Sequence, residues 1–449
     1  MDRMTLNRIF RSSCRTAIVV AFGILLPVMA EAAELPSTTG LTLDKGVEIA
    51  LSRHPLLLEK SADVDAAKAR VGIATAPYYP RIDTSAGYER FEHPAVFFRP
   101  SGGAAQGFGD TIGPLDDFTA RLEARWIVWD GGARRAERDA FVARAGGTLA
   151  DTEAARQGVI FRVREAFFDH VTARRLEEVG MKSLSRAEKH LAFSRERYAA
   201  GTVPKEDVLK AQVELADANL SLVSARSAVR STLARLNTAM GIPAETGTTV
   251  VPPEDTLVPP DTTQLSAALS GAESRRPELK TTLANVVASD AVIRKAKAAF
   301  LPQVGVSGML GVRDTDFPPG EKDWSAGVNV TWPLFTGVAR GNERDLAKAE
   351  AEKARARFQG VSNRIREEVV VAHSGLRETF EAVHAAEVLV ADAKESLRLA
   401  EERYANGAGT ILDLLDAQVS LTRAEAKGIE AALSHQSAYS RFLLVTGSL

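Results

Sequence analysis

Apolar residues recur at every seventh position along two long stretches of the chain. The first series consists of Val208, Leu215, Leu222, Val229 and Leu236, with small residues in the complementary positions at Ala211, Ala218, Ala225, Thr232 and Ala239. The second series consists of Val369, Leu376, Val383, Val390 and Leu397, with Ala372, Thr379, Ala386, Ala393 and Ala400. Sustained heptads of this kind predict coiled-coil helices. Because small residues let helices approach closely, the pattern favours a wall of many helices over a simple rod.

Two helices of the chain are expected to be very long. Residues 133–197 and 338–403 contain no proline and no strong turn signal. At 1.5 Å per residue, each stretch would form roughly 100 Å of helix. Shorter helices are expected near 205–240, 411–445, 44–76 and 265–300. Two short helices placed end to end have about the length of one long helix, which suggests hairpins that pack side by side along their length.

Alternation of apolar and polar residues predicts four strands, one pair within 81–129 and one pair within 302–334. Strands of about ten residues with one polar side and tryptophan near their ends are typical of outer-membrane barrels. Arg121, Glu123 and Arg125 are expected on the lumen face, where they either tune permeability or form a balanced, solvated wall. Ordinary half-buried strands are the alternative interpretation of the alternation.

Four strands are too few to close a barrel, since the smallest such barrels have about eight. Backbone groups in lipid cannot remain unpaired. Several copies of the chain must therefore share one barrel, and the strand count by itself permits either a dimer or a trimer.

The chain contains one structural pattern twice. The passage ERYAAGTVPKEDVLKAQVEL at Glu196 returns as ERYANGAGTILDLLDAQVSL at Glu402, 206 positions later. His54-Pro55 and Arg276-Pro277 are separated by 222 positions, so the first copy carries 16 extra residues in an enlarged loop at 92–117. A long fixed period predicts tandem repeats.

The repeats divide the chain into consecutive segments. The first repeat spans 33–241, with the strand pair 81–129 followed by a helical hairpin at 133–240. The second spans 264–449, with the strand pair 302–334 and a hairpin at 338–446. The proline-rich segment 242–263 joins them and forms either irregular structure beside the helices or a disordered linker.

The first residues are predicted to be a cleaved secretory signal. A leader with four arginines precedes a short apolar run at 16–29, and cleavage is expected after Ala30 or Ala32, which gives a signal peptide at 1–32. The single cysteine, Cys14, leaves with the signal, so neither an acyl anchor nor a disulfide is expected in the mature chain.

Composition argues against nucleic-acid binding and against enzymatic activity. The chain has 56 basic and 58 acidic residues, so its net charge of −2 gives no electrostatic argument for a nucleic-acid partner. Its seven histidines are scattered, without metal-ligand spacing. No nucleophile elbow or phosphate-binding loop is present in the sequence. We therefore expect no enzyme, no cofactor and no metal site.

The sequence resembles the outer membrane efflux protein family, the TolC-like exit ducts of Gram-negative bacteria. The resemblance covers nearly the whole mature chain and rests on LTLDKGVEIALSRHP, on the WDGG and LFTG junctions, and on the two repeated passages. It implies a mostly α-helical protomer with a small β part, which contributes four strands to a shared 12-stranded trimeric outer-membrane barrel. Its long helices would form a periplasmic α-barrel.

The resemblance also implies a function and its partners. Members are passive ducts of tripartite efflux pumps or type I secretion systems, and an inner-membrane transporter and a periplasmic adaptor supply the cargo. The expected location is the outer membrane, with extension into the periplasm. A soluble periplasmic coiled-coil scaffold is the alternative, and the sequence does not specify the cargo.

The repeated passages are expected at the closed end of the helical tunnel. By resemblance, the adaptor docks at the two helix turns, which consist of Gly201, Thr202 and Val203 in the first repeat and Gly407, Ala408, Gly409 and Thr410 in the second. Turn formation alone also explains their glycines.

Four residues are expected at the constriction. Asp413 and Asp416 lie three residues apart on one helix face and match the family's paired acidic residues at the entrance. A helix-capping role for Asp413 is an equally good interpretation. Tyr404 and Asp207 match residues that join a network holding the entrance shut in members of the family. The basic residue expected to bind them is Gly409 in this sequence, which weakens the inference that they hold the entrance closed here.

Overall fold

The computed structural model describes residues 40–91, 115–253, 259 and 265–449, and Gly40–Leu449 form one compact unit. The predicted signal peptide, almost all of the enlarged loop and part of the proline-rich segment lie outside the described residues. None of the helices in the described part of the chain has an apolar stretch long enough to cross a bilayer.

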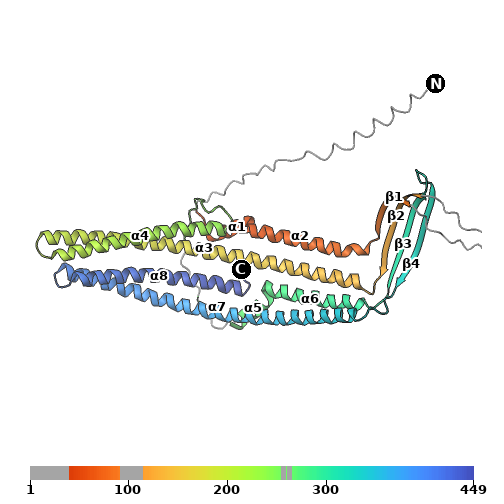
Figure 1. Ribbon diagram of the computed structural model, residues 1–449. Coiled ribbons are helices and arrows are strands. Elements are labelled where there is room, and N and C mark those ends of the chain that lie inside the picture. Colours follow the sequence, from red (N-terminus) through yellow and green to blue (C-terminus); the bar gives the residue numbers. More distant parts are fainter. Residues whose placement is uncertain (1–39, 92–114, 254–258, 260–264) are drawn as a thin grey trace, which may run out of the picture. The chain divides into compact units, whose positions relative to one another are not determined.

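Apart from the short helix η1 of the first repeat, the two repeats contain the same elements in the same order (Figure 1). The first consists of α1 (Leu43–Arg53), α2 (Pro55–Thr75), η1 (Ala76–Tyr78), β1 (Arg81–Phe91), β2 (Leu115–Trp129), α3 (Ala133–Ala199) and α4 (Lys205–Ala239). The second consists of α5 (Leu265–Arg275), α6 (Pro277–Ala298), β3 (Gln303–Asp314), β4 (Glu321–Thr331), α7 (Ala339–Ala405) and α8 (Ile411–Val445). The predicted four strands and the two long helices are confirmed.

The short helices expected at 44–76 and 265–300 are each divided in two, so their prediction as single helices was wrong. His54 and Arg276 have extended backbones, with ψ of 123° and 120°, and each precedes a proline that begins the next helix. Proline disfavours a helical conformation in the residue before it, and it fits the first turn of a new helix. The HP and RP dipeptides therefore bring about the break.

The four strands form one antiparallel sheet in the order β1-β2-β3-β4. Its two faces differ in polarity, as the alternation predicted. One face carries large exposed apolar side chains, namely Ile82, Leu122, Trp126, Leu310, Trp324, Val328 and Val330. The register places Glu123 opposite Asp83 and Met309, and Arg121 opposite Ser85 and Gly311, on the other face.

The heptad positions form the seams of the helical hairpins. None of the twenty seam residues is exposed; all are buried or half-buried. An apolar cluster at the end of α7 and the start of α8 includes Leu397, Tyr404, Ile411 and Leu414. A second cluster joins α1, α3 and α4 around Phe167, Leu236 and Met240. The helices are therefore held together by narrow apolar seams rather than by one central core.

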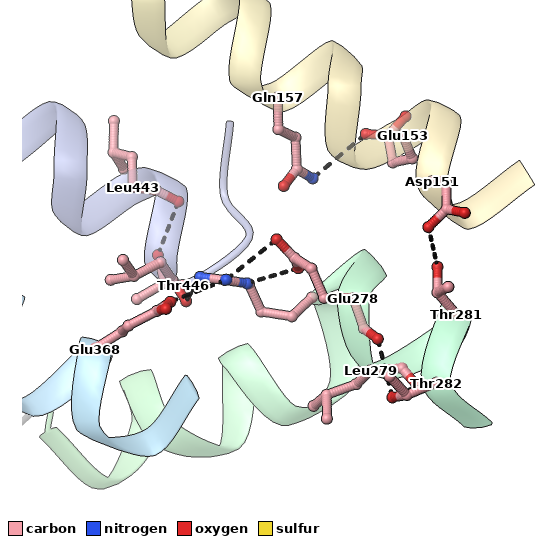
Figure 2. A network of polar contacts seen from close by, with 12 residues as sticks. Asp151, Glu153, Gln157, Glu278, Leu279, Thr281, Thr282, Glu368, Leu443 and Thr446 are labelled. Carbon is pink, nitrogen blue, oxygen red and sulfur yellow. Dashed lines mark hydrogen bonds and ion pairs between the residues drawn. The ribbon is translucent and has the colours of Figure 1, made fainter. Parts of the chain in front are cut away.

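A polar network joins the start of α6 to α7 and to the end of α8 (Figure 2). The side chain of Arg276 is 8% exposed and forms ion pairs with Glu278 at 2.9 Å and Glu368 at 3.0 Å. It also donates a hydrogen bond to the carbonyl oxygen of Val445. Because a buried cation requires partners of opposite charge, this network fixes α6, α7 and α8 to one another.

Candidate functional site

The two helix turns have the same backbone geometry. Gly201 has φ of +71° and Gly407 has φ of +72°, a region that favours glycine. The amide of Thr202 donates to the carbonyl of Arg197 at 2.9 Å, and the amide of Ala408 donates to that of Arg403 at 2.8 Å. These bonds satisfy carbonyls that a helix end leaves unpaired.

The turn residues are accessible to a partner. Gly201, Thr202, Gly407, Ala408 and Thr410 are exposed, while Val203 and Gly409 are half-buried. Local geometry accounts for the glycines at these positions, and the exposure of their neighbours is compatible with docking. The docking role stays a prediction.

Asp413 completes a capping box at the start of α8. Its Oδ2 accepts hydrogen bonds from the Thr410 amide at 3.1 Å and from the Thr410 hydroxyl at 2.8 Å, while its own amide donates to that hydroxyl. These donors lower the pKa of the Asp413 carboxyl. The helix-capping interpretation of Asp413 therefore has direct geometric support.

Asp416 has a different environment from Asp413. Its side chain is exposed on α8, and its carboxylate forms no hydrogen bond or ion pair with any described residue. Neither helix capping nor an ion pair with a described residue accounts for an acidic side chain at position 416. Of the two acidic residues, Asp416 is the one left free to act on solvent or on ions.

Tyr404 lies inside the helical packing rather than on its surface. It is 4% exposed, and its hydroxyl finds no hydrogen-bond partner among the described residues. Asp207 is half-buried near the start of α4, and no hydrogen bond joins it to Tyr404 in the described chain. The structure of one chain thus does not bring together the two residues expected to form the latch.

A contact that the sequence analysis missed lies beside Tyr404. Arg197, on the last turn of α3, donates from Nη1 to the carbonyl oxygen of Tyr404 at 2.8 Å. Its guanidinium lies 5.3 Å from the centre of the Tyr404 ring and 5.6 Å from that of Phe193. The only sequence signal was the position of Arg197 in the repeated ERYA motif, which Arg403 shares.

The polar face of the sheet contains paired charges. Arg125 binds Glu123 through two hydrogen bonds, of 2.5 Å and 2.6 Å, and Arg313 binds Asp117. Arg121 is half-buried, and its Nε has no partner among the described residues. Glu123 and Arg125 also line a cavity of about 790 Å³ near the start of β3. Because these charges largely cancel, the balanced-wall interpretation gains support over a strong electrostatic filter.

Residues 46–242 and 268–448 match the family model described as outer membrane efflux protein. Protein CyaE of Bordetella pertussis is 28% identical over 386 residues, which cover 84% of this chain and 78% of CyaE. The pyoverdine export outer membrane protein OpmQ of Pseudomonas aeruginosa is 24% identical over 409 residues, covering 88% of this chain and 83% of OpmQ.

The solved structure of the CmeC outer membrane channel from Campylobacter jejuni shares the fold. It superposes with a TM-score of 0.77 at 21% identity, and the match covers 90% of this chain and 85% of CmeC. The tandem arrangement of four strands and long helical hairpins is therefore a fold already known from an outer membrane channel.

The family consists of channel proteins rather than enzymes, and the names of OpmQ and CmeC place both in the outer membrane. The predicted outer membrane exit duct is thereby confirmed, and the soluble scaffold is excluded. The chain belongs to the outer membrane efflux protein family.

Proposed function

We propose that three copies of this chain form one channel, closed at the helix turns and fed by a periplasmic adaptor and an inner-membrane transporter. The edges of the four-stranded sheet support this assembly. β1 and β4 each pair on one side only within the chain. Since strand edges in lipid must be paired, β4 of one copy would pair with β1 of the next. Such head-to-tail contacts close into a ring.

A second surface supports the same assembly. Helix α4 carries, besides its buried seam, an exposed row at the alternating spacing of a coiled coil. The row consists of Leu209, Val213, Ala216, Leu220, Val223 and Ser227. Leu220 and Val213 are each 70% exposed in the single chain. An apolar heptad seam requires a partner helix, and a neighbouring copy supplies one.

The family supports three copies of the chain, and the exposed turns support the position of the entrance. Three copies give twelve strands, and the polar sheet face with Arg121, Glu123 and Arg125 then lines the lumen. Residues 1–32 serve as the signal peptide. The adaptor docks on the exposed turns at Gly201 and Gly407, and Asp416 lies at the entrance.

Assembly is tested by the mass of the purified protein in detergent. Leu220→Glu places a charge in the exposed row and is expected to reduce the trimer to smaller species. Ser221→Glu adds the same charge to the adjacent, exposed position outside the row and is expected to preserve the trimer. If the trimer tolerates both substitutions, α4 does not form part of the interface between copies.

Conductance tests the duct itself. In planar bilayers, the wild-type protein is expected to show a small conductance that favours cations, because three copies bring several carboxylates to one axis. A detergent-purified trimer without any conductance, with or without adaptor, would contradict the proposed channel.

A further inference from the structure

Helices α3, α7 and α8 enclose a layer of buried polar groups just above the turns. Within the described chain, six side-chain atoms of this layer are buried without a hydrogen-bond partner. They are Arg186 Nε, His190 Nδ1, Ser194 Oγ, Tyr404 Oη, and Nε2 and Oε1 of Gln418. Ser194 is fully buried, and Gln418 is 1% exposed. We call these five residues the polar layer.

The polar layer lies between the two hairpins rather than within one of them. His190 on α3 approaches Glu401 of α7 at 3.9 Å, and Arg186 on α3 approaches Thr422 of α8 at 3.2 Å. On α8, Gln418 lies one helical turn closer to the helix turns than Thr422 does. On α3, His190 lies one helical turn closer to them than Arg186 does. A buried polar group without a partner loses its hydration without compensation. Separation of the hairpins would hydrate these six atoms, which favours opening, whereas the contacts of Arg186 with α8 oppose it.

Arg197 opposes that separation. Its hydrogen bond to the Tyr404 carbonyl joins the last turn of α3 to the last turn of α7. The same carbonyl accepts the amide of Gly407, so the contact lies at the start of the second turn. A cation is also stabilised by the negative end of a helix. The rings of Phe193 and Tyr404 pack edge to face at 6.0 Å beneath the guanidinium and hold it in place.

Within the layer, Arg186 makes the other arginine contact between the hairpins. Arg186 lies 11 residues before Arg197 on α3, about three helical turns away. Its Nη2 reaches Thr422 at 3.2 Å and Glu425 at 3.5 Å, both longer than the contact of Arg197. The shorter of these two arginine contacts therefore lies at the turn end of the layer, where the hairpins begin to separate.

We infer that Arg197 is the latch that holds the α7–α8 hairpin against α3, and that the polar layer is the plane along which the two separate. Arg197 thereby takes the part that the family resemblance assigns to a basic residue at the position of Gly409. The inference rests on the proposal that the turns form the entrance. Arg403, the repeat equivalent of Arg197, is exposed and has no side-chain hydrogen bond in the described chain, so it provides a matched control.

Thiol labelling measures the separation without reference to conductance. Ser194→Cys introduces a buried thiol of nearly the same size, and the single natural cysteine, Cys14, is lost with the proposed signal peptide. The reaction rate with a maleimide is measured in the trimer alone, with added Arg197→Gln, and with added Arg403→Gln. Loss of a charge-assisted hydrogen bond predicts labelling about tenfold faster or more with Arg197→Gln. Arg403→Gln is expected to have no effect.

Equal labelling rates in the two arginine variants would overturn the latch. Arg197→Lys retains a donor but not the planar group that lies over the two rings, so it should give an intermediate rate. Gel filtration of each variant verifies that the trimer is intact. If Arg197→Gln accelerates labelling but leaves conductance unchanged, the latch stands and the entrance lies elsewhere, which would contradict the proposed function instead.

Discussion

Gly241 lies directly against the backbone of His54, at the point where α4 ends beside the break between α1 and α2. Gly241 has φ of +76°, and a Cβ at this position would lie 2.9 Å from Cα of His54. In the second repeat, Gly447 has φ of +68°, and its Cβ would lie 2.9 Å from Cβ of Arg275. Each hairpin thus ends in a close contact with the break in its own pair of short helices.

Gly241→Ala is expected to destabilise the protein through two effects. A left-handed conformation costs an L-residue about 1–2 kcal/mol. The overlap with His54 adds about 1–3 kcal/mol, because packed segments must move apart. Gly201→Ala is the control, since Gly201 has φ of +71° but open space around it. The denaturation midpoints of both variants check the prediction, and equal losses would show that the contact with His54 contributes nothing.

Asp416→Asn is expected to reduce cation selectivity without changing stability. The carboxylate of Asp416 is exposed and unpaired among the described residues, so its removal breaks no contact within the chain. Asp413→Asn weakens the capping box and should lower the thermal midpoint. Reversal potentials across a salt gradient and thermal midpoints separate the two effects. Unchanged selectivity in Asp416→Asn would remove this residue from the entrance.

Asp207→Ala is expected to change the gating of the channel little. Asp207 is half-buried, yet its carboxylate forms no hydrogen bond or ion pair with a described residue, and position 409 supplies no cation. The Arg197→Gln variant provides the positive control in the same bilayer experiment. A conductance increase in Asp207→Ala as large as in Arg197→Gln would indicate that Asp207 holds the entrance closed after all.

Glu214 is expected to make stability fall as the pH rises towards neutrality. Burial raises the pKa of the Glu214 carboxyl from 4.5 to about 7, although the positive charge of Arg186 opposes the change. The folded chain therefore binds this proton more tightly than the unfolded chain does. The associated stability is fully present below pH 4.5 and is lost as the pH rises through 7.

Glu214→Gln should remove this pH dependence. Discounted for partial solvent screening, the effect is on the order of 1 kcal/mol per chain. Thermal midpoints of wild type and variant between pH 4 and pH 8 check the prediction. Asp217→Asn, at an exposed position one turn along α4, serves as the control. Parallel pH profiles for wild type and Glu214→Gln would exclude Glu214 as the source.

The sequence was sufficient to predict the elements and their repetition, because these depend on local periodicity. The heptads specified which side of α4 and of the second half of α7 would be buried, and alternation specified the two faces of the sheet. The breaks at His54 and Arg276 were missed, although the proline after each residue was a visible local signal.

The environment of the site residues depended on tertiary structure. Arg197 and Arg403 occupy the same place in the same ERYA motif, yet Arg197 binds Tyr404 and Arg403 is exposed. The burial of Tyr404 and the unpaired amide of Gln418 were equally hidden from the sequence. A local motif specifies its own helix and turn but not the neighbouring helix that packs against it. Only the packing of α3 against α7 and α8 gives these two equivalent positions different partners.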